Sequence, residues 1–383
     1  MDGSSQLDVV GAGPAGLAAA ITAARSGLEV VVHEKAARVG SRFHGDFQGL
    51  ENWTTDRDVL QELTSAGIEP CFDHAPFREQ VVFGPDGVGH RLRSEQPFYY
   101  LVRRGPGPGT LDQALLAQAR EAGVEVRFRD PVESLPGGGI VAHGPRRTDV
   151  VAVGYTFDTE LDDGAWAALG EDIAPGGYAY LLAWNGRGTL AVCLFRDFHR
   201  EKLYLQRAVE LFRERVGLRW EDERPFGGAG GFRLPATAVR GNLLVAGEAA
   251  GFQDPLWGFG MRYALLSGHL AARAWLEGDL EAYDGLWKGS LGGLMRAGAV
   301  NRALYALFAD RGYRLLVRSF SAASEPRSWL RRRCTPSWKT RLLYPLLRER
   351  SFPTRESDEC GSMSCACTWC RCRRRTAVER TGG

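Results

Sequence analysis

The stretch from Val9 to Leu17 constrains the fold more than any other part of this 383-residue chain. It reads Val-Val-Gly-Ala-Gly-Pro-Ala-Gly-Leu, and an alanine-rich, helix-forming segment follows it. A second β-branched run, 30–32, then leads to Glu34. A strand, a Gly-x-Gly-x-x-Gly turn, a helix and a second strand ending in an acid together form the βαβ unit that binds dinucleotides. The stretch therefore predicts a Rossmann-type dinucleotide site.

Each part of this unit has a physical role in the predicted site. Gly11 permits the tight turn, Gly13 lets the backbone approach a pyrophosphate, and Gly16 allows the helix to pack closely on the strand. Free N–H groups at the helix N-terminus attract phosphates, and the acid can accept a hydrogen bond from a ribose hydroxyl. The predicted contacts in this half of the site are Gly11, Gly13, Pro14, Ala15, Gly16, Glu34 and Lys35.

The composition is that of an ordinary globular protein, with 44% hydrophobic and 25% charged residues. A net charge of only +2 gives no global field for nucleic acid, so no nucleic-acid partner is expected. The first residues lack the basic start of a signal peptide, and no apolar run reaches the roughly 18 residues of a membrane span. We therefore expect a cytoplasmic protein.

A second informative stretch lies at 242–261, where an apolar run delivers Glu248 into a Gly/Ala-rich turn. Gly258-Phe259-Gly260 follows, and a helix is expected from about Arg262 to Ala274. Small residues let the main chain lie against a flat or extended group, while the acid can bind hydroxyls. The predicted contacts in this half of the site are Gly247, Glu248, Gly258, Gly260 and Met261.

Together the two stretches resemble flavoproteins of the para-hydroxybenzoate hydroxylase type. The resemblance implies that the cofactor is FAD, because the second motif of these proteins serves a ribityl chain that NAD lacks. It places Glu248 at a ribityl hydroxyl, and the N–H groups of Gly260 and Met261 near the pyrimidine edge of the flavin. The family usually has Asp at the position of Glu248, so the acceptor is kept on a longer arm.

Three further features resemble the geranylgeranyl reductase branch of that superfamily: Pro-Gly-Gly-Tyr at 175–178, the Gly-Ser turn and its continuation at 35–46, and the helix and strand at 110–126. The first implies a substrate cavity lined by Gly177, Tyr178 and Tyr180. The second implies cofactor contacts at His44, Gly45 and Asp46. The family Arg before the helix is displaced, and Arg103 or Arg104 could replace it across a Pro-Gly insertion; Arg104 is taken as the cofactor contact.

Several family elements are absent. The region 149–154 lacks the Asp-Gly signature of the hydroxylases, the Trp-x-Trp-x-Ile-Pro element of the flavin halogenases is missing, and no second Gly-x-Gly-x-x-Gly unit follows. The resemblance then implies an enzyme that reduces carbon–carbon double bonds of an isoprenoid (geranylgeranyl-type) or other apolar or lipid substrate by hydride transfer from reduced flavin. It would need an external electron donor, either NADPH or a ferredoxin-like protein.

Two alternatives stay open: a flavin-dependent monooxygenase of a small or lipidic substrate, and a non-catalytic flavin- or lipid-binding protein. Anaerobic turnover separates the first from a reductase, because only a reductase works without oxygen. No catalytic residue is assigned from the sequence. His44 is a candidate proton donor, although a lone loop histidine is more often structural or solvated.

The expected fold class is α/β: a Rossmann-type FAD-binding domain with an inserted antiparallel β-sheet substrate domain and a helical C-terminal region. The FAD-binding parts are expected at 1–72, 101–155 and 238–285, and the substrate-domain parts at 73–100 and 156–237. A basic helical region is expected at 286–350 and a cysteine-rich tail at 351–383.

The basic helical region combines arginines and lysines with Trp and Leu at 327–333 and 339–350. Such a pattern fits a solvated basic face, or a surface that rests on anionic lipid headgroups at the cytosolic face of a membrane. In the tail, thiols at short spacing could bind zinc or another soft metal, form reversible disulfides, or be inert. The cysteines concerned are Cys360, Cys365, Cys367, Cys370 and Cys372.

Overall fold

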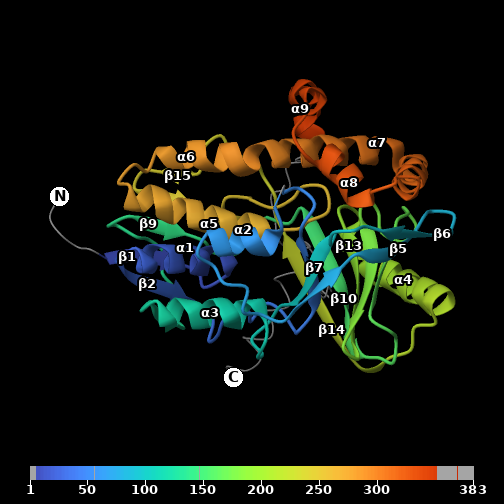
Figure 1. The fold of residues 1–383 in the computed structure, drawn as a ribbon, viewed down its shortest axis with the longest axis horizontal. Helices are drawn as coiled ribbons and strands as arrows, with labels where there is room; N and C mark the ends of the chain where they lie inside the picture. The colour runs from blue at the N-terminus through green and yellow to red at the C-terminus, as the bar shows by residue number, and fades with distance from the viewer. Residues whose placement is uncertain (1–5, 56, 146, 352–368, 370–383) are drawn as a thin grey trace.

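A computed structural model describes residues 6–55, 57–145, 147–351 and 369 (Figure 1). The βαβ unit predicted from the sequence is present as β1 (Gln6–Val10), α1 (Pro14–Arg25) and β2 (Glu29–Glu34). The two strands pair in parallel, with Val9 opposite Val32. Parallel pairing requires a crossover between the strands, and α1 supplies it.

The six-stranded sheet built on this unit has the order β15-β16-β9-β1-β2-β8. Its pairs are parallel except for the hairpin of β15 and β16. The remaining strands are β8 (Glu125–Phe128), β9 (Gly139–Val141), β15 (Val239–Arg240) and β16 (Leu243–Val245). The carboxyl ends of β1, β2, β9 and β16 therefore share one edge of the sheet, where ligands bind in open parallel sheets.

Helix α1 lies between α3 (Leu111–Glu121) and α5 (Met261–Leu276). Its small residues let it pack closely on both the sheet and α5, and eight of its residues are buried. Because alanine and glycine fill so little space, the helices approach until backbone meets backbone; a Cβ on Gly268 of α5 would overlap the carbonyl of Ala15. This packing fixes the first glycine turn against α5.

The seven-stranded sheet forms the other half of the molecule, with the order β14-β10-β13-β12-β11-β5-β6 (Figure 1). All its pairs are antiparallel except β11 with β5. Helix α4 (Glu201–Val216) packs against it, centred on Phe212. The strands are β5 (Glu79–Phe83), β6 (Gly89–Arg93), β10 (Val150–Asp158), β11 (Gly164–Ala168), β12 (Tyr178–Trp184), β13 (Arg187–Leu194) and β14 (Glu221–Gly230).

Two details of this sheet differ from or refine the sequence prediction. Strand β10 lies wholly within it, although 150–155 were expected in the FAD-binding part. The strand is nine residues long and pairs on both sides, with β13 and β14, so it cannot leave the sheet halfway. The sequence Asn-Gly-Arg-Gly at 185–188 predicts a hairpin turn. In the structure the turn between β12 and β13 consists of Asn185 and Gly186, both with positive φ, as a type I′ hairpin requires.

A three-stranded antiparallel sheet completes the β-structure, with β3 (Phe47–Glu51), β7 (Tyr99–Arg103) and β4 (His74–Phe77). Helix α2 (Val59–Ser65) begins at Asp58, whose carboxylate accepts from the N–H of Leu60. The α/β fold class predicted from the sequence is confirmed. The exact division into domain parts stays a prediction.

The C-terminal helices run along the upper side of the view in Figure 1 and span both halves of the molecule. They are α6 (Ala282–Trp287), a π-helical turn (Lys288–Gly292), α7 (Gly293–Ser321), α8 (Pro326–Cys334) and α9 (Trp338–Ser351). Helix α9 packs on α7. Among the described helices, none is both long and apolar enough to cross a membrane.

Candidate functional site

The first glycine turn has the geometry that its sequence predicts. Gly11 has φ +102°, and a Cβ there would lie 2.7 Å from the carbonyl oxygen of Ala142 on β9. A Cβ on Gly16 would overlap the carbonyl oxygen of Gly11. By contrast, a Cβ on Gly13 would meet nothing within 4 Å. Gly11 and Gly16 are thus required by the fold itself, while the space beside Gly13 is open.

Glu34 lies at the end of β2 and faces this turn. Its Oε2 accepts from the N–H of Ala12 at 2.8 Å, and its Oε1 accepts from the N–H of Ala36 at the same distance. These bonds hold the carboxylate beside the glycine turn, where a ribose hydroxyl could share it. Lys35, predicted beside it, is exposed and makes no ion pair within the described part of the chain.

The second glycine stretch lies directly against the first. Gly247 has φ +60°, and a Cβ on it would lie 2.8 Å from the Cβ of Ala15. Its N–H donates to the hydroxyl of Ser267 on α5 at 2.9 Å. The two motifs, more than 200 residues apart in sequence, therefore form one continuous backbone surface, as the resemblance implied.

Glu248 forms an ion pair that the sequence did not predict. Its Oε2 lies 2.8 Å from Nη1 of Arg42, and the same guanidinium donates to the carbonyl of Ala229 on β14. Both partners remain partly exposed, with side-chain exposures of 34% and 20%. Arg42 therefore bridges the two halves of the molecule over the second motif, and it places a movable cation beside the acid predicted to bind a hydroxyl.

The structure also contains a buried polar atom without a partner at this position. Gln253 is 8% exposed, and its Nε2 donates to the carbonyl of Gly258 at 2.7 Å. Its Oε1 is buried and accepts no hydrogen bond from the described residues. An unsatisfied buried acceptor is costly, so a donor from a bound molecule would stabilise it. This acceptor, the open space at Gly13 and the two acids fit the donor groups and phosphates of FAD.

The loop 44–46 is held by Asp46, which is 1% exposed. Its carboxylate accepts from the N–H of His44 at 2.9 Å and from Nε2 of Gln48 at 2.8 Å. Burial raises the pKa of Asp46, although these hydrogen bonds act in the opposite direction. Gly45 adopts φ +87° with open space around it, whereas the side chain of His44 points to the exposed surface beside Phe226. The loop thus offers backbone rather than an obvious proton donor.

Arg104, which the sequence predicts to contact the cofactor, is buried and bonded to another residue of the protein. It is 5% exposed, and its Nε and Nη2 donate to the two oxygens of Asp112, each at 2.9 Å. Its guanidinium also stacks over Phe43, 4.1 Å from the ring centroid. Bidentate pairing uses the fork of the guanidinium. Arg104 therefore holds α3 against the 40s loop, and its contact with a cofactor stays a prediction.

Four half-buried aromatic side chains form what we call the aromatic wall: Tyr178, Tyr180, Trp257 and Tyr305. The rings of Tyr178 and Trp257 lie 5.6 Å apart, and those of Trp257 and Tyr305 lie 5.9 Å apart. The hydroxyl of Tyr178 donates to the carbonyl of Trp257 at 2.8 Å. Burial raises the pKa of both Tyr178 and Tyr180, so both stay neutral. The wall is apolar, and it adjoins Gly258.

Gly177 lets this strand begin so close to its neighbour. A Cβ on Gly177 would overlap the carbonyl oxygen of Cys193 on β13. Of the predicted substrate residues, Tyr178 lies beside the second glycine stretch through its bond to Trp257, and Gly177 and Tyr180 flank it in the chain. Their contact with a substrate stays a prediction.

Arg302 on α7 bonds both to the loop at Gly176 and to the loop at Pro255, and the sequence did not predict this. Its Nε donates to the carbonyl of Pro255 at 2.6 Å, and its Nη2 donates to the carbonyl of Gly176 at 2.9 Å. Its guanidinium lies over Phe195, 3.2 Å from the ring centroid. Burial lowers its pKa to about 9, so it remains charged at neutral pH. An arginine interrupting an apolar helix was the available signal, but its partners lie too far away in sequence to be inferred.

Asp254 precedes the same loop and closes it on itself. Its Oδ2 accepts from the N–H of Trp257 at 2.7 Å, and its Oδ1 accepts from the N–H of Leu256 at 3.1 Å. Burial raises its pKa to about 6, against the lowering effect of these two hydrogen bonds. The carboxyl group is thus partly protonated in mildly acidic solution.

The predicted cysteine site lies outside the described residues. Cys360, Cys365, Cys367, Cys370 and Cys372 all fall within 352–368 and 370–383. Among the residues that the structure does describe, no group of three or more His, Cys, Asp or Glu side chains could hold a metal ion.

Comparisons with known proteins agree with this geometry. Residues 9–49 match the family model of an NAD(P)-binding Rossmann-like domain. A curated relative, the digeranylgeranylglycerophospholipid reductase of Methanosphaerula palustris, is 27% identical over 363 residues, covering 80% of this chain and 84% of the relative. A protein of the same name from Methanosarcina mazei is 26% identical, covering 74% and 80%.

A solved structure with a similar fold is a geranylgeranyl bacteriochlorophyll reductase-like protein from Thermoplasma acidophilum. Its TM-score is 0.69 at 20% identity, and the match covers 91% of this chain and 97% of that one. The chain is thus similar to the FAD-dependent geranylgeranyl reductase family, and the resemblance predicted from the sequence is confirmed.

Proposed function

We propose that this protein is an FAD-dependent oxidoreductase that reduces carbon–carbon double bonds of an isoprenoid, geranylgeranyl-type substrate or a similar apolar lipid. One observation carries the proposal: Tyr178 of the aromatic wall bonds to the carbonyl of Trp257, the residue before Gly258. A substrate on the wall would lie beside the loop proposed to carry the flavin. The relatives named digeranylgeranylglycerophospholipid reductase support this choice of substrate class.

Different groups of the described residues would bind the different parts of FAD. The first glycine turn, Gly11 to Gly16, would hold the pyrophosphate at the N-terminus of α1, and Glu34 would bind the ribose. Glu248 would bind the ribityl chain once Arg42 turns away from it or shares it. The backbone at 44–46 and from Gly258 to Met261 would surround the flavin ring.

When bound and reduced, the flavin would supply a hydride to one carbon of the double bond, and a proton would add to the neighbouring carbon. The chain's own part is to orient the substrate and to exclude water from it. The aromatic wall provides the apolar surface, and Arg302 fixes that surface relative to the flavin loop through the carbonyls of Gly176 and Pro255. An external donor, NADPH or a ferredoxin-like protein, would return the electrons.

The proposal is tested by the mass of the product. Reconstituted and chemically reduced protein is incubated with a geranylgeranyl glycerophospholipid under nitrogen, and the lipid is analysed by mass spectrometry. We expect the gain of two hydrogen atoms for each reduced double bond. A gain of one oxygen atom, formed only in air, would instead establish the monooxygenase alternative.

The fold is compatible with that alternative, because a probable FAD-dependent monooxygenase from Pseudomonas aeruginosa has a similar fold, with a TM-score of 0.60 at 17% identity. Flavin binding without any change in the lipid would support the non-catalytic alternative. Because its substrate would be a membrane lipid, we also propose that the protein acts at the cytosolic surface of a membrane.

A zinc site in the tail is a separate proposal that rests on the sequence alone, in which five cysteines lie between 360 and 372. Metal analysis of the purified protein and of a Cys365→Ser/Cys367→Ser variant tests it. We expect zinc in the first and its loss in the second. A metal-free protein whose thiols oxidise reversibly would favour disulfide chemistry instead.

A further inference from the structure

We propose that the C-terminal helices bind the phosphate groups of an anionic lipid surface through a cationic pocket and the exposed apolar stripe of α9 beside it. This inference goes beyond the proposed reduction, because it concerns the surface on which the protein is held. It does not depend on the flavin, so the two proposals fail independently.

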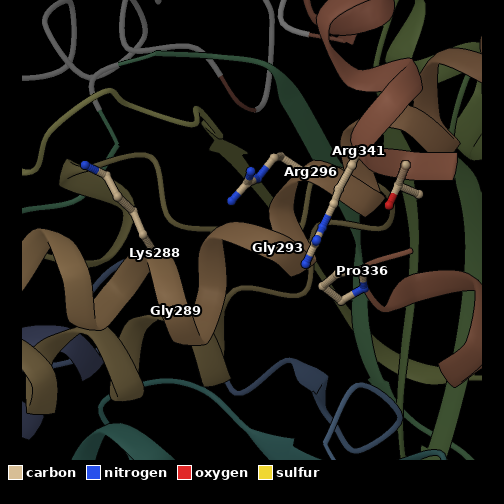
Figure 2. Close-up of a pocket in the computed structure, with 7 residues that line it drawn as sticks. Lys288, Gly289, Gly293, Arg296, Pro336 and Arg341 are labelled. Atoms are coloured by element: carbon tan, nitrogen blue, oxygen red, sulfur yellow. The ribbon is translucent and has the colours of Figure 1, made fainter. Parts of the chain in front are cut away.

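The pocket lies where the π-helical turn and α7 meet the start of α9, and it has a volume of about 260 Å³. In Figure 2 the side chain of Arg341 lies beside Gly293 and Pro336, Arg296 stands next to it, and Lys288, earlier in the chain, lies further away. Thr340 and Gly289 complete the lining. The volume is below the roughly 300 Å³ at which sites for drug-sized ligands begin, so the pocket suits a small headgroup rather than a hydrocarbon chain.

The charges in the pocket are largely uncompensated. Lys288 pairs with Asp284 at 2.8 Å, and that carboxylate is already shared with the indole N–H of Trp287. Among the described residues, Arg296 donates only to the carbonyl of Gly292, the last residue of the π-helical turn. Neither Arg296 nor Arg341 has an ion pair with any carboxylate in the part of the chain that the structure describes. A bound anion would supply the missing negative charge.

The backbone at the pocket is unusual as well. The turn from Lys288 to Gly292 is π-helical, a geometry that is rare and frequently found at functional sites. A Cβ on Gly289 would meet nothing within 4 Å, so this side of the turn is open. A Cβ on Gly293 would lie 2.5 Å from Cγ of Pro336. The close approach at Gly293 positions the start of α9 against α7, and with it the two arginines.

Helix α9 presents an apolar stripe next to this pocket. Trp338, Leu342 and Leu346 are spaced by four residues, so they share one face, and they are 71%, 64% and 75% exposed. Exposed Lys339 and Arg341 border the stripe, and Arg341 also lines the pocket. Large apolar residues flanked by cations are the pattern of helices that lie in a membrane interface.

The charge of the C-terminal region indicates which partner binds the pocket and the stripe. Residues 328–348 contain six arginines and lysines and no acid. The segment 352–383 has six arginines against four acids, so it carries the same sign and is a poor electrostatic partner. A second copy of the chain would also bring like charges together. An anionic lipid surface complements both the cations and the stripe.

Vesicle binding tests this proposal on the full chain. Flotation with vesicles of phosphatidylcholine and phosphatidylglycerol in equal parts is compared with flotation on phosphatidylcholine alone. We expect binding to the first, weakened by added salt because the Debye length shortens, and little to the second. Hydrogen exchange of residues 338–348 should slow when anionic vesicles are added. Unchanged exchange in that segment would place the contact elsewhere and overturn the proposal.

Variants separate the pocket from the stripe. Arg341→Gln should lower the vesicle partition coefficient about fivefold, while Arg187→Gln on β13 should leave it unchanged. Leu342→Ser/Leu346→Ser should lower it at least about tenfold, compared with Val88→Ser, which alters another exposed apolar residue elsewhere. Melting temperatures of all variants check that the fold is intact.

Three results would overturn the proposal. One is flotation that neither the pocket variant nor the stripe variant weakens. Another is a rise in melting temperature with inorganic phosphate, relative to chloride at equal ionic strength, without any binding to anionic vesicles; the pocket would then serve a free anion. The third is concentration-dependent self-association that is lost in Leu342→Ser/Leu346→Ser, because a second copy would then cover the stripe.

Discussion

Replacing Gly13 by alanine separates the role of the glycine turn in folding from its role in binding. Gly13 has φ −85° and ψ −180°, an extended conformation that alanine also adopts before a proline. A Cβ there meets no protein atom within 4 Å. The change at the helix N-cap should cost only about 0.5–1 kcal/mol of unfolding free energy.

The same methyl group occupies the space left for the pyrophosphate. Forcing one extra carbon into a packed contact costs about 1–3 kcal/mol, so we expect the Kd for FAD to rise by about 5- to 150-fold. Gly16→Ala should behave in the opposite way, because its Cβ overlaps the carbonyl of Gly11 and destabilises the protein even without flavin. Gly137→Ala, also in open space but far from the turn in sequence, is the control.

Equilibrium dialysis against FAD and urea unfolding of the flavin-free protein measure the two effects. Gly13→Ala should lose affinity and keep stability, whereas Gly16→Ala should lose stability. Wild-type affinity in Gly13→Ala would refute the reasoning, because it would show that bound FAD does not lie against the backbone at that position.

Three further changes test the rest of the site. Glu248→Gln replaces a charged acceptor by a neutral one, and dialysis should show an FAD affinity about fivefold lower; an unchanged affinity would remove Glu248 from the site. Arg302→Lys cannot hold the carbonyls of Gly176 and Pro255 together, so urea unfolding should show a loss of about 2–4 kcal/mol, and wild-type stability would contradict this role. The pKa of Asp254 is raised by burial to about 6 from 3.8, so the folded state holds its proton more tightly. The unfolding free energy of the wild type, relative to Asp254→Asn, should therefore fall by about 2 kcal/mol between pH 4 and pH 6 and then level off, and a rise across that range would contradict the assignment.

Local patterns explain how much of this fold could be predicted. The glycine turn, α1 and β2 follow from residues within thirty positions of one another, and both motifs proved to form one surface. The hairpin turn at Asn185 and Gly186 likewise follows from its own residues, because Asn and Gly tolerate positive φ. Where spacing and residue type decide the structure, the sequence was sufficient.

Long-range partners could not be predicted in the same way. Arg42 meets Glu248 across 206 positions, and Arg302 meets Gly176 across 126, with no local pattern that selects either partner. Strand β14 was missed because Pro225 and several glycines argue against a strand. It lies at the edge of its sheet, where a proline without an N–H is tolerated.

The most direct test of the proposed function is the absorption spectrum of the flavin during anaerobic turnover. The protein is reconstituted with FAD, reduced chemically under nitrogen and mixed with a geranylgeranyl glycerophospholipid. We predict that the spectrum of oxidised flavin returns without oxygen, at a rate that depends on lipid concentration. A flavin that stays reduced with the lipid and is reoxidised only by air would contradict the reductase function.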